Sequence, residues 1–195
     1  MNFPFKSILL SIAVLLLAVS AHGQSDRIGI YADESANGCN LADVGTEYHQ
    51  LYVIFAGTSR LTALEFQLVP VEGAGLNFMG QAIPDWAAGA MGRADTGVAI
   101  ALGKCVDKES VVLMTVTYLG LGVSDLCSQL RIRPVEFVNG DKIQFVDCRS
   151  NRVWADPGHL TINPDAGCEC EVDPLDQPSP VASTTWGGIK AMYVD

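Results

Sequence analysis

The sequence ALEFQLV at residues 63–69 decides the fold class of this chain. Leu64, Phe66 and Leu68 share one side of an extended strand, and the acidic and amide side chains between them share the other side. Strict alternation of apolar and polar residues is typical of a strand with one buried face. The stretch therefore predicts a β-strand that covers a packed core.

Seven other runs have a similar extended character and are separated by turn residues. The predicted strands are residues 27–32, 48–55, 63–69, 97–102, 111–118, 130–135, 143–146 and 160–162. About eight short strands, regular turns and no long amphipathic helix predict an all-β protein, more narrowly an antiparallel β-sandwich.

Three segments between the predicted strands have sequences that predict a local structure. Residues 73–97 are rich in glycine and alanine, and predict a long excursion between strands with one short helical turn. Asn139-Gly140 is a hairpin signal because both residues tolerate positive φ, with arms predicted at 135–138 and 142–146. Asp156-Pro157-Gly158 predicts a further turn.

The first residues have the pattern of an export signal. Lys6 is the only charge before Asp26, and an apolar run from Ile8 to Val19 follows it. Small residues come next, so cleavage after Ala21 or Gly23 is expected. The apolar run is shorter than the roughly 20 residues that span a bilayer. We therefore expect residues 1–23 to be a cleaved signal peptide and the protein to be secreted, in the periplasm, at the cell surface or outside the cell.

All six cysteines follow this signal, and an even number of cysteines in an exported chain predicts a disulfide framework. A bond between Cys168 and Cys170 would be strained, so each is expected to pair elsewhere, and Cys105 with Cys127 is one plausible pair. Zinc sites use clusters such as paired C-x-x-C, which the sequence lacks, so no metal site is predicted from cysteines. The predicted disulfide residues are Cys39, Cys105, Cys127, Cys148, Cys168 and Cys170.

The charge of the chain excludes some partners. Twenty-two acidic residues face 12 basic ones, for a net charge of −10. An acidic surface disfavours nucleic acids and anionic membranes, which are polyanions. No second apolar run is long enough to span a bilayer, so the mature chain is expected to have no transmembrane anchor.

Known catalytic patterns are missing from the sequence. It has no P-loop, no H-E-x-x-H, no G-x-G-x-x-G and no G-x-S-x-G. Cysteines in disulfides supply no thiolate nucleophile. We therefore expect a protein that is not an enzyme and that needs no cofactor. Bound calcium stays open as an alternative, because calcium takes oxygen ligands and acidic residues crowd the last third at Asp141, Asp147, Asp156, Asp165, Glu169, Glu171 and Asp173.

Aromatic side chains are the other candidate binding groups. Trp86 lies in the glycine-rich excursion, where a flat ring can face a sugar or a protein. Trp154 is expected in the core.

The composition changes near the C-terminus. Residues 24–172 are the predicted sandwich domain, and the proline-rich stretch 173–182 is a predicted linker. Residues 183–195 form a short apolar tail. Trp186, Ile189 and Tyr193 have the spacing of one helical face and predict a docking surface, because so short a helix is not stable alone.

Two groups of residues resemble known proteins. Thr184–Tyr193 resembles the T-T-W-G-x-I-K-x-L-Y ending of assorted uncharacterised secreted bacterial proteins, with Met192 in the position where leucine is usual. The body resembles exported bacterial proteins with a GIYAD…C opening, here from Gly29 to Cys39, and an INPD…C-x-C end, here from Ile162 to Cys170. A tail shared among assorted exported domains implies sorting or anchoring. The sandwich is also loosely similar to cohesin-like and carbohydrate-binding domains.

The sequence thus predicts a non-catalytic secreted or cell-surface binding module for a protein or a glycan. A secreted hydrolase of glycans or peptides is the first alternative, and a structural envelope component is the second. Ligand, oligomeric state and disulfide connectivity stay open.

Overall fold

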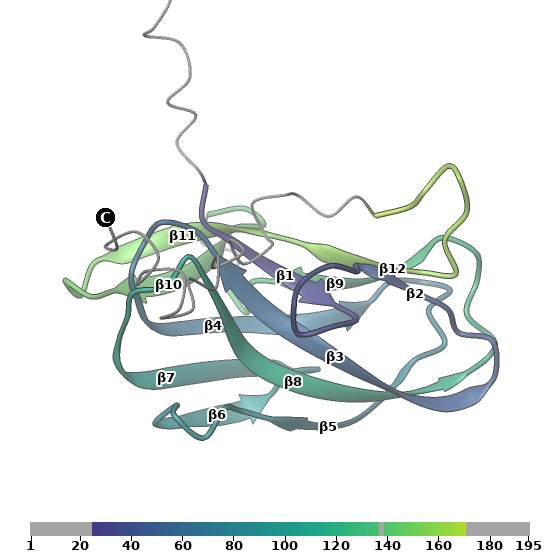
Figure 1. Ribbon diagram of the computed structural model, residues 1–195, viewed down its shortest axis with the longest axis horizontal. Helices are drawn as coiled ribbons and strands as arrows, with labels where there is room; N and C mark the ends of the chain where they lie inside the picture. Colours follow the sequence, from purple (N-terminus) through teal and green to yellow (C-terminus); the bar gives the residue numbers. More distant parts are fainter. Residues whose placement is uncertain (1–24, 137–138, 171–195) are drawn as a thin grey trace, which may run out of the picture.

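The computed structural model describes residues 25–136 and 139–170, and this part of the chain is all-β (Figure 1). Its strands are β1 (Arg27–Tyr31), β2 (Asn40–Leu41), β3 (Thr46–Ala56), β4 (Leu61–Pro70), β5 (Asn77–Ala82), β6 (Gly89–Arg93), β7 (Gly97–Val106), β8 (Ser110–Leu121), β9 (Ser128–Arg133), β10 (Ile143–Asp147), β11 (Arg152–Pro157) and β12 (His159–Ile162).

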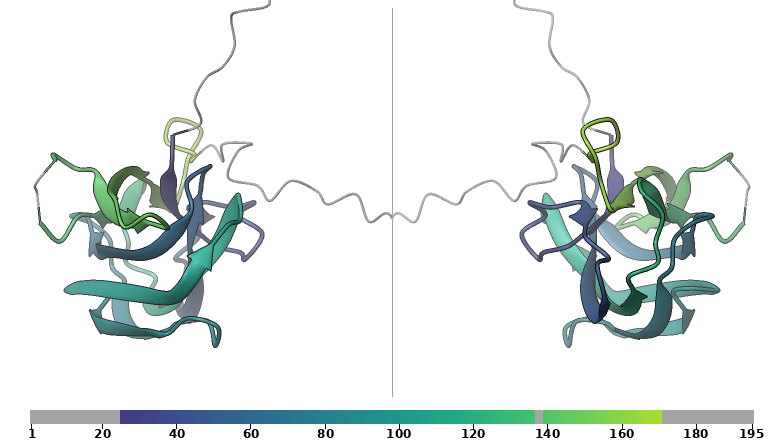
Figure 2. Two further views of the ribbon diagram at one scale, coloured as in Figure 1. Left: turned by 90° about the vertical axis from the view of Figure 1, so that its left-hand side faces the viewer. Right: turned by 90° about the vertical axis from the view of Figure 1, so that its right-hand side faces the viewer.

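The strands form two layers that face each other across the core, as the end views in Figure 2 show. One layer has the order β5-β8-β3-β1. The other has β6-β7-β4 and continues through β10 and β9, which pair with successive halves of the same edge of β4. β12 and β2 extend the second layer beyond β9. Most pairs are antiparallel, but β1 with β11 and β2 with β12 are parallel.

The core lies between the layers because alternate residues of each strand point inward. On β4 the inward residues are Leu64, Phe66 and Leu68, as the alternation in the sequence predicts. Phe55 of β3 meets Phe145 of β10 across the core, edge to face, with ring centroids 5.3 Å apart. This contact joins the two layers directly.

The two edges of the sandwich are connected in different ways. At one edge β11 pairs with β10 of one layer and with β1 of the other. At the other edge the side-chain amide of Gln81 on β5 bonds to β6 and to the residue that follows it. The Gln81 Nε2 donates to the Gly92 carbonyl, and the Gln81 Oε1 accepts from the Ala94 N–H. The edge strands β5 and β6 are therefore held by one side chain.

A small second cluster covers the outer face of β1 and β3. Tyr31, Ala36, Cys39 and Ile54 are buried there, beneath the loop between β1 and β2. Cys39 is bonded to Cys170, and both the N–H and the carbonyl of Cys170 are hydrogen-bonded to the Asn40 amide. The last described residue is thereby attached to the N-terminal part of the sandwich.

All six cysteines form disulfides, as the sequence predicts. The suggested pair, Cys105 with Cys127, does not form. The pairs are Cys39–Cys170, Cys105–Cys148 and Cys127–Cys168. The predicted Cys105–Cys127 bond is wrong because the two residues flank β8 at its opposite ends. A strand of this length extends about 40 Å, whereas a disulfide needs Cα atoms within about 7 Å.

Two predictions between the strands are wrong. Residues 73–97 contain strands β5 and β6 in place of an excursion with a helical turn. Asn139-Gly140 does form a turn, with Gly140 at φ 62°, but the predicted hairpin does not form: residues 135–136 lie in a bend. Both edges of β10 are already occupied, by β4 and β11. Residues 137–138 lie outside the described residues.

The predicted turn at Asp156-Pro157-Gly158 is also wrong. Asp156 and Pro157 end β11, and Gly158 separates it from β12. At this point the chain leaves β1 and β10 and continues beside β9. A Cβ at Gly158 would lie 3.1 Å from the Gly29 Cα, which is closer than most Cβ contacts, so glycine favours this close approach of the two backbones.

The proposed signal peptide at 1–23, the linker at 173–182 and the tail with Trp186, Ile189 and Tyr193 lie outside the described residues. The structure also has more strands than the eight predicted, because β2, β5, β6 and β11 were not foreseen.

Candidate functional site

A groove of about 630 Å³ lies on the outer face of β4, β6, β7 and β10. It is a candidate site because outward-facing residues of a sheet normally meet water without forming a hollow. Its lining residues are Ala63, Leu64, Glu65, Ala88, Gly89, Ala90, Met91, Ala99, Ile100, Ala101, Glu136, Gln144, Phe145, Val146 and Arg152.

The floor of the groove is a row of mostly small side chains that crosses five strands. Ala101 of β7 pairs with Gly89 of β6 on one side and with Ala63 of β4 on the other. Ala63 pairs with Val146 of β10, which pairs with Arg152 of β11. The groove is hollow because the first three of these positions carry a methyl group or a hydrogen.

The walls of the groove carry larger side chains. In the next row, Ala99 pairs with Met91 and with Glu65. The Met91 side chain is 79% exposed, which is unusual for an apolar residue of this size. Glu65, Glu136 and Arg152 add charge at the rim. The groove thus combines an apolar floor with a rim that has more acidic than basic groups.

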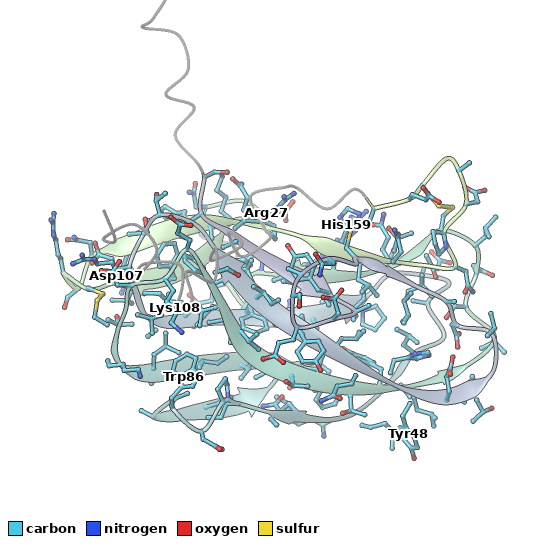
Figure 3. All side chains as sticks on the ribbon, in the orientation of Figure 1. Arg27, Tyr48, Trp86, Asp107, Lys108 and His159 are labelled. Atoms are coloured by element: carbon cyan, nitrogen blue, oxygen red, sulfur yellow. A yellow bond between two sulfur atoms is a disulfide. The ribbon has the colours of Figure 1, made fainter. Side chains whose placement is uncertain are left out.

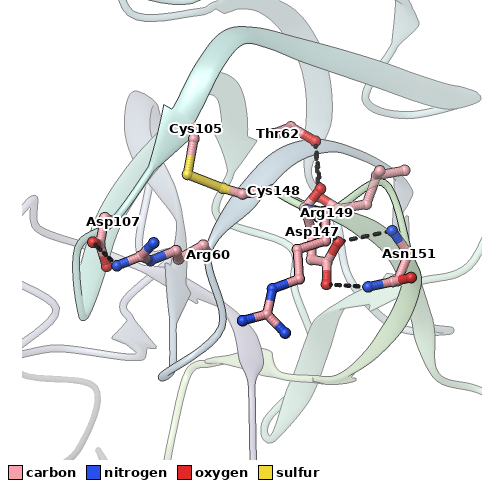
Figure 4. The surroundings of a disulfide bond; sticks show 9 residues. Arg60, Thr62, Cys105, Asp107, Asp147, Cys148, Arg149 and Asn151 are labelled. Carbon is pink, nitrogen blue, oxygen red and sulfur yellow. Dashed lines mark hydrogen bonds and ion pairs between the residues drawn. A yellow bond between two sulfur atoms is a disulfide. The ribbon is translucent and has the colours of Figure 1, made fainter.

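A disulfide lies at one end of the strands that form the groove, and Figure 4 shows its surroundings. Cys105 on β7 is bonded to Cys148, which follows β10. The Thr62 hydroxyl donates to the carbonyls of Val146 and Asp147. Strands β7, β4 and β10 are therefore connected at their ends as well as by their backbone ladders.

Asp147 shapes the turn between β10 and β11 beside this disulfide. Its carboxylate accepts hydrogen bonds from the Asn151 amide and from the backbone N–H groups of Asn151 and Arg149. These bonds stabilise the ionised form and hold the pKa of Asp147 below its ordinary value. The turn fixes the direction in which β11 leaves the groove.

The predicted aromatic site residue, Trp86, is not among the residues that line the groove. It lies between β5 and β6, is 37% exposed and has the Lys104 Nζ 5.4 Å from its ring centroid (Figure 3). Trp154 is half-buried and pairs with Gln144 of the groove rim. The prediction of a core position for Trp154 is therefore wrong, since the residue is on the outer side of β11.

A second polar cluster joins three loops at the other end of the sandwich. The Asp43 carboxylate accepts hydrogen bonds from the N–H groups of Gly122, at 2.9 Å, and Ser124, at 3.1 Å. The Asn163 amide binds the Asp43 N–H and the Ser124 carbonyl. Asp43 is only 2% exposed, and the nearby His49 is only 8% exposed. The cluster is a loop anchor.

Burial raises the pKa of Asp43, but hydrogen bonds from Ser124 and Gly122 and the nearby His49 lower it, and the net pKa is below its ordinary value.

We expect Asp43→Asn to lower the free energy of unfolding by about 2 kcal/mol at pH 7, since hydrogen bonds to a charged group are lost. Because the pKa of Asp43 is lower in the folded than in the unfolded chain, its carboxylate stabilises the fold fully at pH values above the unfolded-state pKa. This contribution to the free energy of unfolding is lost as the pH falls through the folded-state pKa.

Urea denaturation of both proteins at pH 7 and at pH 3 measures this effect. The difference between wild type and Asp43→Asn should shrink at pH 3. Asp107→Asn, which removes only the surface ion pair with Arg60, is the control and should change stability little at either pH. A difference for Asp43→Asn that is the same at both pH values would contradict the assignment.

The acidic residues of the last third do not gather around a common position within residues 25–136 and 139–170. Asp147 is engaged in its turn, and Asp156 is paired with Lys142. The one close group of potential ligands in the described ranges is Cys127, Asp165 and Cys168. Two of these are joined in a disulfide and offer no thiolate. Calcium therefore stays a prediction, and Glu171 and Asp173 lie outside the described residues.

The groove is not among the features that the sequence predicts. The available signal was the run from Gly97 to Leu102, in which Val98, Ile100 and Leu102 alternate with Ala99 and Ala101. Small apolar residues stand there where polar residues normally face water.

No helix that is long and apolar enough to cross a membrane occurs among the described residues.

The fold is similar to that of known proteins, although the sequence is not. No family model and no curated protein matches the sequence. A cohesin module from a family 33 glycoside hydrolase of Clostridium perfringens is similar in structure, with a TM-score of 0.51 and 10% identity, over 73% of this chain and 99% of that one. A non-cellulosomal cohesin from Archaeoglobus fulgidus has a TM-score of 0.50 and 12% identity, over 71% of this chain and 91% of that one. At these identities the likeness shows the fold alone, which is a cohesin-like β-sandwich.

Proposed function

We propose that this chain is a secreted, non-catalytic module that binds another protein through the groove on β4, β6, β7 and β10. The observation that carries the proposal is the row of small residues through Gly89, Ala101 and Ala63, which lets a partner segment approach the sheet closely. In this proposal residues 1–23 direct export, 24–172 form the module, and 173–182 connect it to the tail at 183–195.

The chemistry of the groove favours a protein segment over a glycan. Sugar-binding sites use flat aromatic faces, and the one aromatic residue that lines the groove is Phe145, whose side chain is buried in the core. An exposed methionine such as Met91 suits an apolar protein surface, because its side chain adapts in shape. Glu65 and Glu136 at the rim favour a partner segment with basic residues beside its apolar face.

The test compares three versions of the exported chain as bait against the extracellular and envelope proteins of its native host. Ala101→Arg fills the groove with a long charged side chain at an exposed position of β7. Thr117→Arg adds the same charge to β8 in the other layer, where residue 117 is half-exposed, and is the control. Captured proteins are quantified by mass spectrometry, and the affinity for each is then measured by calorimetry.

We expect Ala101→Arg to weaken binding of the partner roughly 100-fold, as does loss of a central contact in an interface, and Thr117→Arg to leave it unchanged. Equal capture by all three baits would refute the groove as the binding surface. The hydrolase alternative makes a different forecast, because Glu65 and Glu136 are two carboxylates in one groove. Release of reducing sugar from a glycan, lost in Glu65→Gln, would replace the binding proposal.

A further inference from the structure

A second cavity of about 220 Å³ lies at the junction of β9, β11 and β12, and shares no residue with the groove. We name it the basic cleft. Its lining residues are Arg131, Ile132, Arg133, Asp141, Pro157, Gly158 and His159. Positive side chains are concentrated here although the whole chain has a net charge of −10.

The fold brings these cations together from separate strands. Arg131 and Arg133 alternate with buried Leu130 and Ile132 on β9, so both point outward. His159 of β12 is the registered partner of Arg131. The Ile132 N–H donates to the Gly158 carbonyl at 3.2 Å, which holds the corner between β11 and β12 against β9.

Both arginines of the basic cleft are available to a ligand. Elsewhere in the described ranges, Arg60, Arg93 and Lys142 each form an ion pair with an aspartate. No carboxylate within residues 25–136 and 139–170 forms an ion pair with Arg131 or Arg133. The Arg131 Nε donates to the Gln129 side chain at 2.7 Å, which orients its guanidinium and leaves the terminal nitrogens for a second acceptor.

His159 lies close enough to the arginines for their positive charges to affect its pKa. Burial lowers the pKa of His159, and the charges of Arg131 and Arg27 lower it further. Arg27 and His159 lie on the same edge of the molecule in Figure 3. Asp141 is the one carboxylate in the lining, and it opposes an anion.

We propose that the basic cleft binds an anionic group, a carboxylate or a sulfate, through Arg131 and Arg133. Guanidinium groups bind planar or tetrahedral oxyanions with paired N–H donors, which a single lysine does not do. The cavity is smaller than the roughly 300 Å³ at which sites for whole small molecules begin. It therefore receives the charged group of a larger ligand or a small free anion. This inference does not depend on the groove.

The test is an NMR titration of the isotope-labelled exported chain at constant ionic strength, in which sodium sulfate replaces sodium chloride. Parallel titrations use D-glucuronate and the neutral sugar D-glucose. We expect saturable shifts of the Arg131, Arg133 and His159 signals with sulfate or glucuronate and none with glucose. Binding of glucuronate identifies the carboxylate of a sugar acid as the group, and binding of sulfate alone identifies an inorganic or sulfate-ester anion.

Three variants make the assignment specific. Arg131→Gln with Arg133→Gln should weaken binding at least about tenfold, and Arg149→Gln, an exposed arginine in the turn after β10, should leave it unchanged. Asp141→Asn should tighten binding about threefold, an outcome that misfolding does not produce. Shifts that grow linearly with anion concentration, or that all four proteins share, would overturn the proposal.

Discussion

Replacing Cys39 and Cys170 together by alanine should lower the free energy of unfolding by about 5 kcal/mol. The bond joins residues 131 positions apart, and closing a loop of that length removes much of the entropy of the unfolded chain. It also holds the loop that covers Tyr31 and Ile54. Guanidinium denaturation at pH 7, under non-reducing conditions, measures the change.

The other two disulfides provide an internal comparison for this prediction. Cys105–Cys148 and Cys127–Cys168 close loops of 43 and 41 positions, for which the chain-entropy relation gives about 4 kcal/mol each. The Cys105→Ala/Cys148→Ala variant should therefore be more stable than the Cys39→Ala/Cys170→Ala variant by about 1 kcal/mol. The opposite order would mean that loop length does not govern these bonds.

Phe145→Ala should cost about 4 kcal/mol, because it leaves a cavity where a fully buried ring joins the two layers. β10 is paired on both sides, with β4 and β11, so its backbone does not move easily to fill the space. Thermal and chemical denaturation of the variant give the loss of stability directly.

The neighbouring residue is the control for this substitution. Val146 points to the other side of β10, into the groove, and Val146→Ala should cost about 1 kcal/mol or less. A double-mutant cycle with Phe55→Ala should give a coupling energy of about 1 kcal/mol for the aromatic pair. If Phe145→Ala and Val146→Ala had equal effects, the assignment of inner and outer faces on β10 would be wrong.

The strands that the sequence predicts correctly are those whose pattern of apolar residues matches the face that is buried in the structure. Alternation at residues 63–69 and β-branched residues at 111–118 signal one buried face, and β4 and β8 cover both. β5 and β6 were missed because their glycine, alanine and polar residues have low strand propensity. They form because Gln81 and the ladders to β8 and β7 hold them. β11 was missed because Pro157 and Gly158 resemble a turn, although Pro157 only ends the strand.

The candidate site was harder to predict than the fold. Ala63, Ala101 and Gly89 have no chemistry of their own and come from three different strands. Their alignment depends on the register between strands, which one sequence does not show. The same limit applies to the disulfides, since the pairing of Cys105 with Cys148 follows from how β7 and β10 flank β4. Arg131 and His159 come together only once β12 is registered against β9.

The parallel pairing of β1 with β11 imposes an order in time. A chain is made from its N-terminus, so β1 exists long before Asp156, the registered partner of Arg27. Until then β1 has β3 on one side and an unpaired backbone on the other, which is a template for association between unfinished chains. Contacts between residues so distant in sequence also form slowly. Until β11 arrives, this edge of β1 is open to association between chains, and a chaperone that covers the edge would protect the growing chain.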